Sequence, residues 1–479
     1  MRAIAATTLV LAVSNCTAHP QAATGKEARL ESCRYDVAVA KARPLTLDVT
    51  AECAGRGFAA FSANEPELLP HLREVRDLEG RLLQRDGARY RLPDSGRAGL
   101  RYRVDLDAIA ASAQSFDVAL RSGDTLIAPV STWLLRPEPP GADTRVLVSV
   151  RSLPGVDFAT GLTPAGEGFE LGAHEIRVGT YSAFGTLARS RVELPGPLAL
   201  DEASATRARI EVVVADGPLD VERAALERWI VDSATAVARF WRGFPVPRAL
   251  LVVLPVTGRS GVLFGKVLPE SAPGIVVMVG ERSDRAALSR DWILVHELFH
   301  LGFPSFVAEG KWLDEGLATY YEPIIRARAG MKTEEAVWEE FSRAMPQGLP
   351  ALTGAGLDGA TEYREVYWGG ALVCLLADVE ARRRTRGRTG LEHGLVEVLR
   401  RGGHASEVWS LSDTIATIDA ALKAPILAEL ARRYGQRGGP VDLAALWRAL
   451  GVRRVDGGVQ LRDDAPLAHV RRAIVAGVP

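Results

Sequence analysis

The sequence predicts a multidomain α+β protein with a β-sandwich-like N-terminal domain, an α/β middle domain and an α-helical C-terminal lobe. A chain of 479 residues, 47% of them hydrophobic, is long enough for about three domains that each bury a core. Apolar residues alternate with period two in the first part of the chain, whereas they recur at helical spacing after about residue 360. The predicted domains therefore cover residues 30–195, 200–350 and 351–479.

The N-terminal domain is predicted from short runs of alternating polar and apolar residues, the pattern of half-buried strands. Gly, Pro and Asp separate these runs, with a break at residues 136–141 and an end at residues 194–197. Cys33 and Cys53 can form a disulfide in an oxidising compartment, and two unpaired thiols are the alternative. The clearest strand patterns are residues 35–39, 45–49, 102–106 and 146–150.

The middle and C-terminal parts of the chain change from α/β to helical patterns. Residues 210–214, 250–254 and 275–279 predict strands, and residues 221–242 predict an amphipathic helix that ends before a glycine. The tail after residue 400 is expected to be helical. The predicted helices of the C-terminal lobe are residues 363–383, 390–399, 414–433 and 441–450.

Two features of the predicted helix 363–383 are interpreted as structural. Cys374 lies in an apolar run and is expected to pack as a small hydrophobic side chain. The arginines from Arg382 to Arg388 are interpreted as a solvated helix end, because cations favour a helix C-terminus. An anion site is the alternative for these arginines.

Residues 1–22 are predicted to be an export signal. An initial Met-Arg pair precedes an apolar stretch, residues 3–13, that is much shorter than the about 20 residues needed to span a bilayer. Residues 13–16 loosely match a lipoprotein cleavage box that would place a lipid anchor on Cys16, and cleavage after Ala18 is the alternative. We expect an exported protein in the periplasm or cell envelope, with no transmembrane helix after the signal.

The charge balance excludes a strongly basic nucleic-acid-binding protein. Lys and Arg number 58 against 59 Asp and Glu, which gives a net charge of -1. No field of the whole chain would attract nucleic acid or an anionic membrane surface. Specific binding must therefore depend on a local site.

The segment His296-Glu297-Leu298-Phe299-His300 contains the pattern His-Glu-x-x-His. Residues four apart lie on one face of a helix, so both imidazoles can reach a single Zn2+. Glu297 then lies beside the metal, where a carboxylate can act as a general base. With 8 histidines in the chain, chance predicts on the order of 0.01 such matches. The motif therefore indicates a zinc site, and two histidines of a helical core are the alternative.

A zinc hydrolase needs a third protein ligand and an open position for water. Gly302 and Pro304 predict that the motif helix stops after His300, so the chain can turn back. Glu315 is the candidate third ligand, because a second helix beginning near Asp314 would project it from its first turn toward the histidines. On spacing alone the rivals are Glu309, Asp314 and Glu322.

The motif, followed by Trp-Leu-Asp-Glu-Gly at residues 312–316, resembles the gluzincin metallopeptidases, whose third zinc ligand is the Glu before that Gly. Residues 367–378 resemble the Tyr-x-Lys-Gly segment and following helix of the glycyl-aminopeptidase branch, which is related more distantly to aminopeptidase N. The resemblance covers roughly residues 200–400 and implies a thermolysin-like catalytic domain in an aminopeptidase that hydrolyses peptides or proteins. It also implies one Zn2+ per chain on His296, His300 and Glu315, with Glu297 as base and Tyr367 as donor to the tetrahedral intermediate.

Two departures from that family bear on the substrate. Aminopeptidases of the wider group carry an acid before the zinc helix that binds the substrate's amino group, whereas residues 258–266 contain none. Gly369 stands where the family has Lys. These departures leave open an endopeptidase-type zinc hydrolase and a non-catalytic cell-surface binding protein with a vestigial zinc site.

One predicted strand and three aromatic residues near the motif are candidates for contact with a substrate, and the sequence assigns none of them to a pocket. The predicted strand 275–279 can pair with an extended peptide by β-addition. Trp292, Phe303 and Phe306 are aromatic residues close to the motif that can line a pocket.

Overall fold

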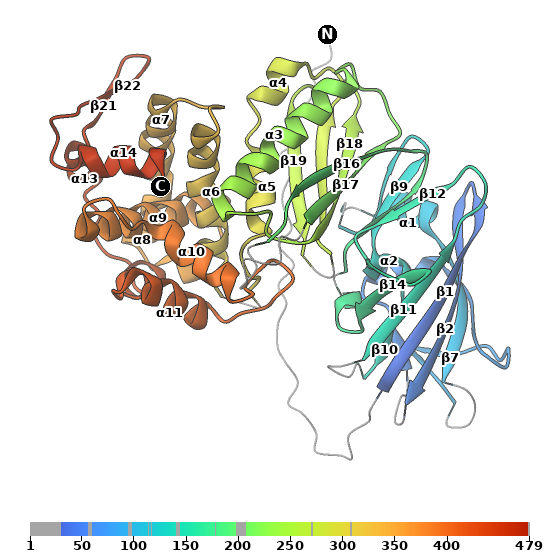
Figure 1. Ribbon diagram of the computed structural model, residues 1–479. Helices are drawn as coiled ribbons and strands as arrows, with labels where there is room; N and C mark the ends of the chain where they lie inside the picture. Colours follow the sequence, from blue (N-terminus) through green and yellow to red (C-terminus); the bar gives the residue numbers. More distant parts are fainter. Residues whose placement is uncertain are drawn as a thin grey trace, which may run out of the picture.

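A computed structural model describes residues 30–55, 60–93, 98–113, 115, 117–139, 144–177, 179–197, 207–269, 272–306 and 309–477. The predicted export signal, residues 1–22 with Cys16, lies outside the described residues. In chain order the described part forms a β-sheet region, a five-stranded sheet with helices and a helical lobe (Figure 1). Among the helices of this part, none has the length and apolar character needed to cross a membrane.

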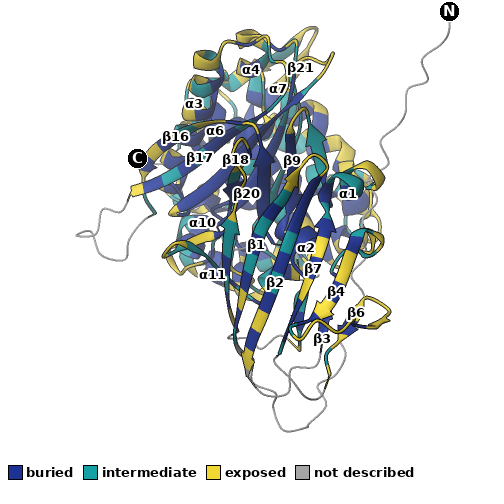
Figure 2. Ribbon diagram, turned by 90° about the vertical axis from the view of Figure 1, so that its right-hand side faces the viewer, coloured by how far each residue is buried: buried dark blue, intermediate teal, exposed yellow. Residues whose placement is uncertain are grey.

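A seven-stranded sheet dominates the N-terminal region. Buried residues alternate with intermediate or exposed ones along much of β1 (Leu30–Ala42), β2 (Leu45–Gly55) and β7 (Gly99–Asp105), as the colours of the ribbon in Figure 2 show. The four strand patterns predicted from the sequence all lie in this sheet, except that residue 106 begins a helix, α1 (Leu106–Ser112). In spatial order its strands are β13 (Thr163–Ala165), β14 (Gly168–Gly172), β11 (Arg145–Arg151), β1 (Leu30–Ala42), β2 (Leu45–Gly55), β7 (Gly99–Asp105) and β4 (Leu72–Asp77).

Two four-stranded sheets complete the N-terminal region. Phe61 and Phe184 of these sheets join one hydrophobic core with the large sheet, and Trp133 packs edge-on against Phe184 at 5.9 Å. Residues 136–138, which were predicted as part of a break, instead form β10. One small sheet is β10 (Arg136–Glu138), β3 (Ala60–Ser62), β6 (Arg89–Arg91) and β5 (Arg85–Asp86), and the other is β12 (Asp157–Thr160), β15 (Tyr181–Gly185), β9 (Thr125–Pro129) and β8 (Leu120–Ser122).

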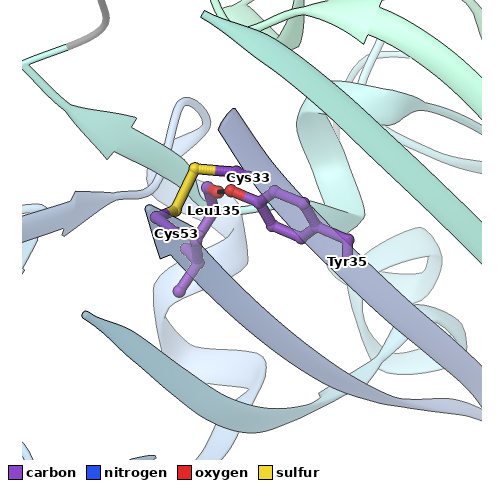
Figure 3. Close-up of a disulfide and its surroundings, with 4 residues drawn as sticks. All are labelled: Cys33, Tyr35, Cys53 and Leu135. Carbon is purple, nitrogen blue, oxygen red and sulfur yellow. Dashed lines mark hydrogen bonds between the residues drawn. A yellow bond between two sulfur atoms is a disulfide. The ribbon is translucent and has the colours of Figure 1, made fainter. Parts of the chain in front are cut away.

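A disulfide joins Cys33 and Cys53, which lie directly opposite each other on β1 and β2 (Figure 3). Both cysteines are buried. The neighbouring Tyr35 hydroxyl donates a hydrogen bond of 2.7 Å to the carbonyl of Leu135, which ties β1 to the chain that leads into β10. Of the two alternatives for these cysteines, the structure contains the bridged pair.

A five-stranded mixed sheet follows in the middle region. The predicted strands 210–214, 250–254 and 275–279 lie in three parallel strands of this sheet, and the predicted helix 221–242 is α3 (Arg223–Trp241). Residues 187–195, which fall inside the range predicted for the N-terminal domain, pair with this sheet instead. The spatial order is β16 (Leu187–Pro195), β17 (Arg207–Ala215), β18 (Arg248–Val256), β20 (Gly274–Gly280) and β19 (Val262–Leu268).

The strand order corrects one prediction about peptide binding. Strand β20 contains residues 275–279 and pairs with β18 on one side and with β19 on the other, so it has no free edge. The prediction that an extended peptide pairs with residues 275–279 is therefore wrong. The terminal strand of the described sheet on this side is β19.

The two faces of the five-stranded sheet have different partners. Helices α3 and α5 (Ile293–His300) share a hydrophobic core with one face (Figure 1). Residues of β9 and β15 pack against residues of β18 and β20 in a separate core on the other face. The sheet therefore connects the N-terminal region to the helices.

Nine helices of the described residues follow α5 and form the C-terminal lobe together with a short hairpin. The predicted helix 414–433 is wrong as a single element, because the chain breaks after α11 (Leu411–Leu422) at Lys423, which has a φ of 58°, and at Pro425. The expectation of a purely helical tail is also wrong, because β21 (Val452–Val455) pairs with β22 (Gly458–Leu461). The helices are α6 (Lys311–Arg328), α7 (Glu334–Ala344), α8 (Leu349–Thr353), α9 (Tyr363–Thr385), α10 (Leu391–Arg400), α11 (Leu411–Leu422), α12 (Ile426–Leu430), α13 (Leu443–Leu450) and α14 (Ala468–Ala476).

The arginines at the end of α9 are not all solvated. Arg382 is fully buried, and its guanidinium donates to Asp378 at 2.9 Å and to Glu392 at 2.6 Å. The prediction of a solvated helix end holds for Arg383 and Arg384, which pair with Glu380 near the surface. For Arg382 it is wrong, because two buried carboxylates neutralise its charge. Cys374 on the same helix is a buried free thiol, as predicted.

Candidate metal centre

The first two candidate ligands lie on α5, whose start is fixed by Asp291. The Asp291 carboxylate accepts hydrogen bonds from the main-chain nitrogens of Ile293 at 2.9 Å and Leu294 at 3.0 Å, which are free donors at a helix start. The helix ends at His300, and the chain turns at Gly302, where a Cβ would collide with the ring of Trp241. The structure thus confirms the predicted stop after the motif.

The donor atoms of three residues converge. Nε2 of His296 lies 3.3 Å from Oε2 of Glu315 and 3.2 Å from Nε2 of His300. Nε2 of His300 lies 3.6 Å from the same oxygen of Glu315. Among the described residues, these three form the one group of histidine, cysteine or acidic side chains placed to hold a metal ion.

The geometry of this group fits a zinc ion. Tetrahedral ligands at about 2.0–2.1 Å from Zn2+ lie about 3.3 Å from one another, close to the separations of these three atoms. Two imidazoles and a carboxylate are also a donor set of catalytic zinc sites, which leave the fourth position open. His296, His300 and Glu315 would therefore hold a zinc ion without rearrangement.

Asp314 orients one of the two histidines. Its Oδ1 lies 2.8 Å from Nδ1 of His300, so an N–H at that nitrogen donates to the carboxylate and Nε2 faces the metal site. Nδ1 of His296, in contrast, is buried and has no hydrogen-bond partner within the described part of the chain. Asp314 was predicted as a rival ligand, whereas in the structure it contacts Nδ1 of His300, on the side of the ring away from the other candidate ligands.

The carboxylates of the site have opposite pKa shifts. Burial alone would raise the pKa of Glu315, but its hydrogen bonds with His296 and His300 hold that pKa well below its usual range. Burial raises the pKa of Glu297, and the two histidines only partly oppose this effect. Glu315 is therefore an ionised candidate ligand, whereas Glu297 is the carboxyl that more readily accepts a proton.

Strand β19 passes directly beside Glu297. A Cβ at Gly265 would lie 2.7 Å from Cγ of Glu297, so only a glycine permits this approach of strand and helix. The adjacent Lys266 pairs with Asp117 of the N-terminal region at 2.6 Å. Gly265 was not predicted as a site residue, and no strand was predicted at residues 262–268.

Tyr367 reaches the centre from α9. Its ring stacks on His296 with centroids 5.9 Å apart and an angle of 6° between the planes. Burial raises the pKa of Tyr367, and the nearby Glu315 carboxylate raises it further, so the hydroxyl remains a donor at neutral pH. Tyr363 packs on Tyr367 with centroids 3.9 Å apart. Tyr363 was not predicted as a site residue, although it precedes Tyr367 by one helical turn.

The rival ligands Glu309 and Glu322 are not part of the group of converging donor atoms. Glu309 lines a separate cavity of about 670 Å³ together with Phe306. Glu322 is buried and accepts a hydrogen bond of 3.1 Å from Arg326. Phe303 is buried in the core, so Trp292 alone of the three aromatic candidates is exposed near the motif. Helix α6 begins at Lys311 rather than near Asp314, which places Glu315 in its second turn.

Comparisons with known proteins agree with this architecture. No protein-family model matches the sequence, and no curated protein matches it. An aminopeptidase N family protein from Idiomarina loihiensis has a similar structure, with a TM-score of 0.65 and 14% sequence identity over 88% of this chain and 78% of that one. An M1 zinc metallopeptidase from Deinococcus radiodurans matches with a TM-score of 0.53 and 15% identity over 86% of this chain and 95% of that one.

The chain has the multidomain fold of the M1 zinc metallopeptidases. A mutant of the Deinococcus radiodurans enzyme bound to a Tyr-Ser-Ala substrate gives the same TM-score of 0.53, with 15% identity over 86% of this chain and 95% of that one. This fold is the one that the resemblance to gluzincins implies. The Deinococcus radiodurans protein with this fold is named a zinc metallopeptidase, and zinc is the metal that the three donor atoms fit.

Proposed function

We propose that this protein is a zinc-dependent metallopeptidase that hydrolyses peptide bonds, and that it acts as an aminopeptidase. One observation carries the proposal: Nε2 of His296, Nε2 of His300 and Oε2 of Glu315 converge beside Glu297 and Tyr367. A structural zinc site needs neither a carboxyl that accepts protons nor a hydroxyl donor beside it. The fold shared with M1 zinc metallopeptidases supports the same activity.

Each residue has a chemical role in this proposal. Zinc held by the three ligands supplies Lewis-acid activation of water and of the scissile carbonyl. The Glu297 carboxylate takes the proton of the attacking water and delivers it to the leaving amine. The Tyr367 hydroxyl donates a hydrogen bond to the oxygen on which negative charge develops. Asp314 holds the His300 ring in the tautomer that presents Nε2.

The strand β19, the last one on its side of the described sheet, is proposed to hold the substrate backbone. It pairs with β20 on one side, and Gly265 brings it against Glu297. An extended peptide added to its other side would lie beside the proposed base. Residues 262–268 contain no acid that could bind a free amino terminus, which favours an endopeptidase-type hydrolase as the second candidate. The Tyr-Ser-Ala substrate of the Deinococcus radiodurans mutant favours an exopeptidase if the two proteins share specificity.

Metal content and turnover together test the proposal. The purified chain should contain about one zinc per molecule and cleave short peptides. Cleavage restricted to free amino termini would support an aminopeptidase, and cleavage of N-acetylated peptides would support the endopeptidase. A Glu297→Gln variant should keep the metal and lose turnover by at least about 10³-fold, because the proton acceptor is removed.

A matched control separates catalysis from a vestigial site. Glu309→Gln removes an acid from the same connection between the two metal-binding helices, but from a separate cavity. It should leave turnover unchanged. Zinc at full occupancy without turnover on any peptide would favour the binding protein with a vestigial site, and a chain that binds no zinc would contradict the proposal.

Two finer predictions belong to the same proposal. Membership of the glycyl-aminopeptidase branch rests on residues 367–378 and stays a prediction. Export to the periplasm or cell envelope, with residues 1–22 removed or Cys16 lipidated, is proposed because a buried disulfide of Cys33 and Cys53 suits an oxidising compartment. Fractionation of cells followed by mass spectrometry of the mature amino terminus tests it.

A further inference from the structure

A small cavity lies where the ends of helices α3, α6, α10 and α14 meet. It is separate from the metal centre, because its residue on α6 is Arg328, the last of that helix, whereas Glu315 is in the second turn. The helix between these two residues spans about 20 Å. The volume of the cavity is about 170 Å³, and pockets for drug-sized ligands occupy about 300–1,000 Å³, so it admits only a small molecule or ion. The polar side chains that line it are Arg239, Arg242, Arg328, Glu392 and His393.

The carboxylate of this cavity is already neutralised. Glu392 accepts hydrogen bonds of 2.7 and 2.6 Å from Arg382 and one of 3.3 Å from Arg328. Arg382 also pairs with the buried Asp378 at 2.9 Å. Two arginines thus balance two carboxylates, and this network leaves no negative charge to compensate further cations.

Arg239 and Arg242 add two positive charges to the cavity. Arg239 lies in the last turn of α3 and Arg242 directly follows the helix, and neither has an ion-pair partner among the described residues. Their charges repel each other, because residues three apart are neighbours at a helix surface. Helices α3, α6 and α14 each end here with about half a negative charge, and α10 begins here with about half a positive one. These helix ends offset about one of the two charges, so the cavity stays electropositive.

Arg328 has a hydrogen-bond donor to spare. Its guanidinium lies over the Phe240 ring, 5.8 Å from the ring centre, and Nη2 donates to the carbonyl of Ile474 at 2.7 Å. Nε of Arg328, in contrast, is buried without a hydrogen-bond partner in the described part of the chain, which costs free energy. A Cβ at Gly477 would lie 3.2 Å from Nε and Cζ of Arg328, so this glycine leaves the guanidinium uncovered. The cavity therefore combines excess positive charge with an unsatisfied N–H.

We propose that this cavity binds a phosphate group, either inorganic phosphate or the phosphate of a small monoester. Guanidinium groups donate paired hydrogen bonds to phosphate oxygens. A phosphate group offers at least three acceptor oxygens and up to two negative charges, which suits three guanidiniums better than the two oxygens of a carboxylate. The bound anion would connect α3 of the middle region to α6 and α14 of the helical lobe. This site is independent of the proposed peptidase activity.

Titration calorimetry with inorganic phosphate at constant ionic strength tests the proposal. The wild-type chain should show saturable binding of phosphate. Arg239→Gln and Arg242→Gln should each weaken this binding by about 10-fold, because each removes a charged hydrogen-bond partner. Both side chains are exposed, so the variants should fold. A wild type without saturable binding would overturn the proposal, and so would binding that the double variant retains in full, because the anion would then lie elsewhere, such as at the metal centre.

Arg228→Gln is the matched control. Arg228 is an exposed arginine of the same helix, but it does not line the cavity. The variant should keep the wild-type affinity for phosphate. An equal loss of affinity in Arg228→Gln would contradict the site, because the general charge of α3 would then explain the binding.

Two further anions identify the ligand. Glycerol 3-phosphate binding as well as inorganic phosphate would assign the site to the phosphate group of a monoester, and binding of inorganic phosphate alone would assign it to the free ion. Both outcomes support the proposal. Acetate binding as tightly as phosphate would overturn it, because two acceptor oxygens would then suffice.

Unfolding separates a phosphate site from arginines that only neutralise helix ends. A ligand that binds the folded chain stabilises it, so phosphate should raise the urea midpoint of the wild type. It should not raise the midpoint of the double variant Arg239→Gln with Arg242→Gln. If the variant lost the same stability with and without phosphate, the arginines would act on the helix ends alone and the proposal would be wrong.

Discussion

Gly370 lies against the main chain of Trp312, where a Cβ would collide with the Trp312 carbonyl oxygen. The Cα of Gly370 also faces Gly316, so helices α6 and α9 cross with their backbones in contact. Glu315 immediately precedes one of these glycines, and Tyr367 lies one turn before the other. The crossing therefore brings a proposed metal ligand and a proposed oxyanion donor, 52 residues apart in the chain, to the ring of His296, with Glu315 at its Nε2 and Tyr367 against its face.

Replacing Gly370 by alanine should separate the two helices. The added methyl group has backbone atoms as neighbours, which cannot move aside as a flexible side chain can, so we expect a loss of at least about 2 kcal/mol of unfolding free energy. Peptidase activity of the remaining folded fraction should fall about 10-fold or more, because Tyr367 shifts relative to the metal site. Urea unfolding and kcat measured on folded protein check the two effects.

Gly359→Ala is the matched control for Gly370→Ala. Gly359 has open space around its Cβ position and lies in the same lobe. Gly359→Ala should change the free energy of unfolding by no more than about 0.5 kcal/mol and should leave the activity unchanged. If both glycine variants behaved alike, the close crossing would not be what positions the site.

Replacing Asp314 by asparagine should weaken zinc binding. The His300 Nδ1–H would lose a charged acceptor at 2.8 Å, and such partners of ligating histidines typically change metal affinity by 10–100-fold. Competition with a fluorescent zinc chelator measures the dissociation constant. Glu309→Gln, an acid that lines a separate cavity, serves as the control, and an unchanged zinc affinity in Asp314→Asn would contradict the orienting role.

Local rules predicted that the candidate metal ligands come together, because four-residue helical spacing and a turn after the motif decide their placement. The same rules did not predict that β19 pairs with β20 and covers its edge. Strand order depends on contacts between distant segments. Residues 275–279 were predicted to bind a peptide because β19, which pairs with them, was not predicted as a strand. Arg382 shows the same limit, since its burial depends on Glu392 and on how α10 packs.

For two wrong predictions, the helix 414–433 and the purely helical tail, the sequence contains local signals that outweigh helical periodicity. Pro425 lies in the interior of the predicted helix 414–433, where it removes a donor and clashes with the preceding turn. Asp456-Gly457 separates two valine-containing runs, which is a hairpin signal, and β21 and β22 pair across it. The boundary between the N-terminal sheets and the middle sheet, in contrast, had no local signal. The sequence of β16 does not show that this strand pairs with the middle sheet.

The Cys33–Cys53 disulfide should stabilise the N-terminal sheets. The cysteines are 20 residues apart, and closing a loop of that length in the unfolded chain is worth about 3 kcal/mol. The double variant Cys33→Ser with Cys53→Ser should lower the urea midpoint accordingly, and dithiothreitol should lower the midpoint of the wild type but not of this variant. Alkylation of the denatured, unreduced chain should leave both cysteines unmodified and label Cys374, whereas labelling of Cys33 or Cys53 would contradict the bridge.

Glu322 should make the protein less stable at alkaline pH. Burial, and after it the Glu340 carboxylate, raise the pKa of Glu322 to about 8, although Arg326 partly opposes the shift. A carboxyl whose pKa is higher in the folded than in the unfolded chain contributes stability below the unfolded value of about 4.5, and this contribution is lost as the pH rises toward 8. The loss amounts to a few kcal/mol for a fully buried group.

Glu322→Gln keeps the shape and an acceptor for Arg326 but removes the titration. Urea unfolding at pH 5, 7 and 9 should therefore show a smaller fall in stability for Glu322→Gln than for the wild type. Glu335→Gln, an exposed acid in α7, should keep the wild-type slope, and parallel slopes for wild type and Glu322→Gln would show that Arg326 keeps Glu322 ionised in the folded protein.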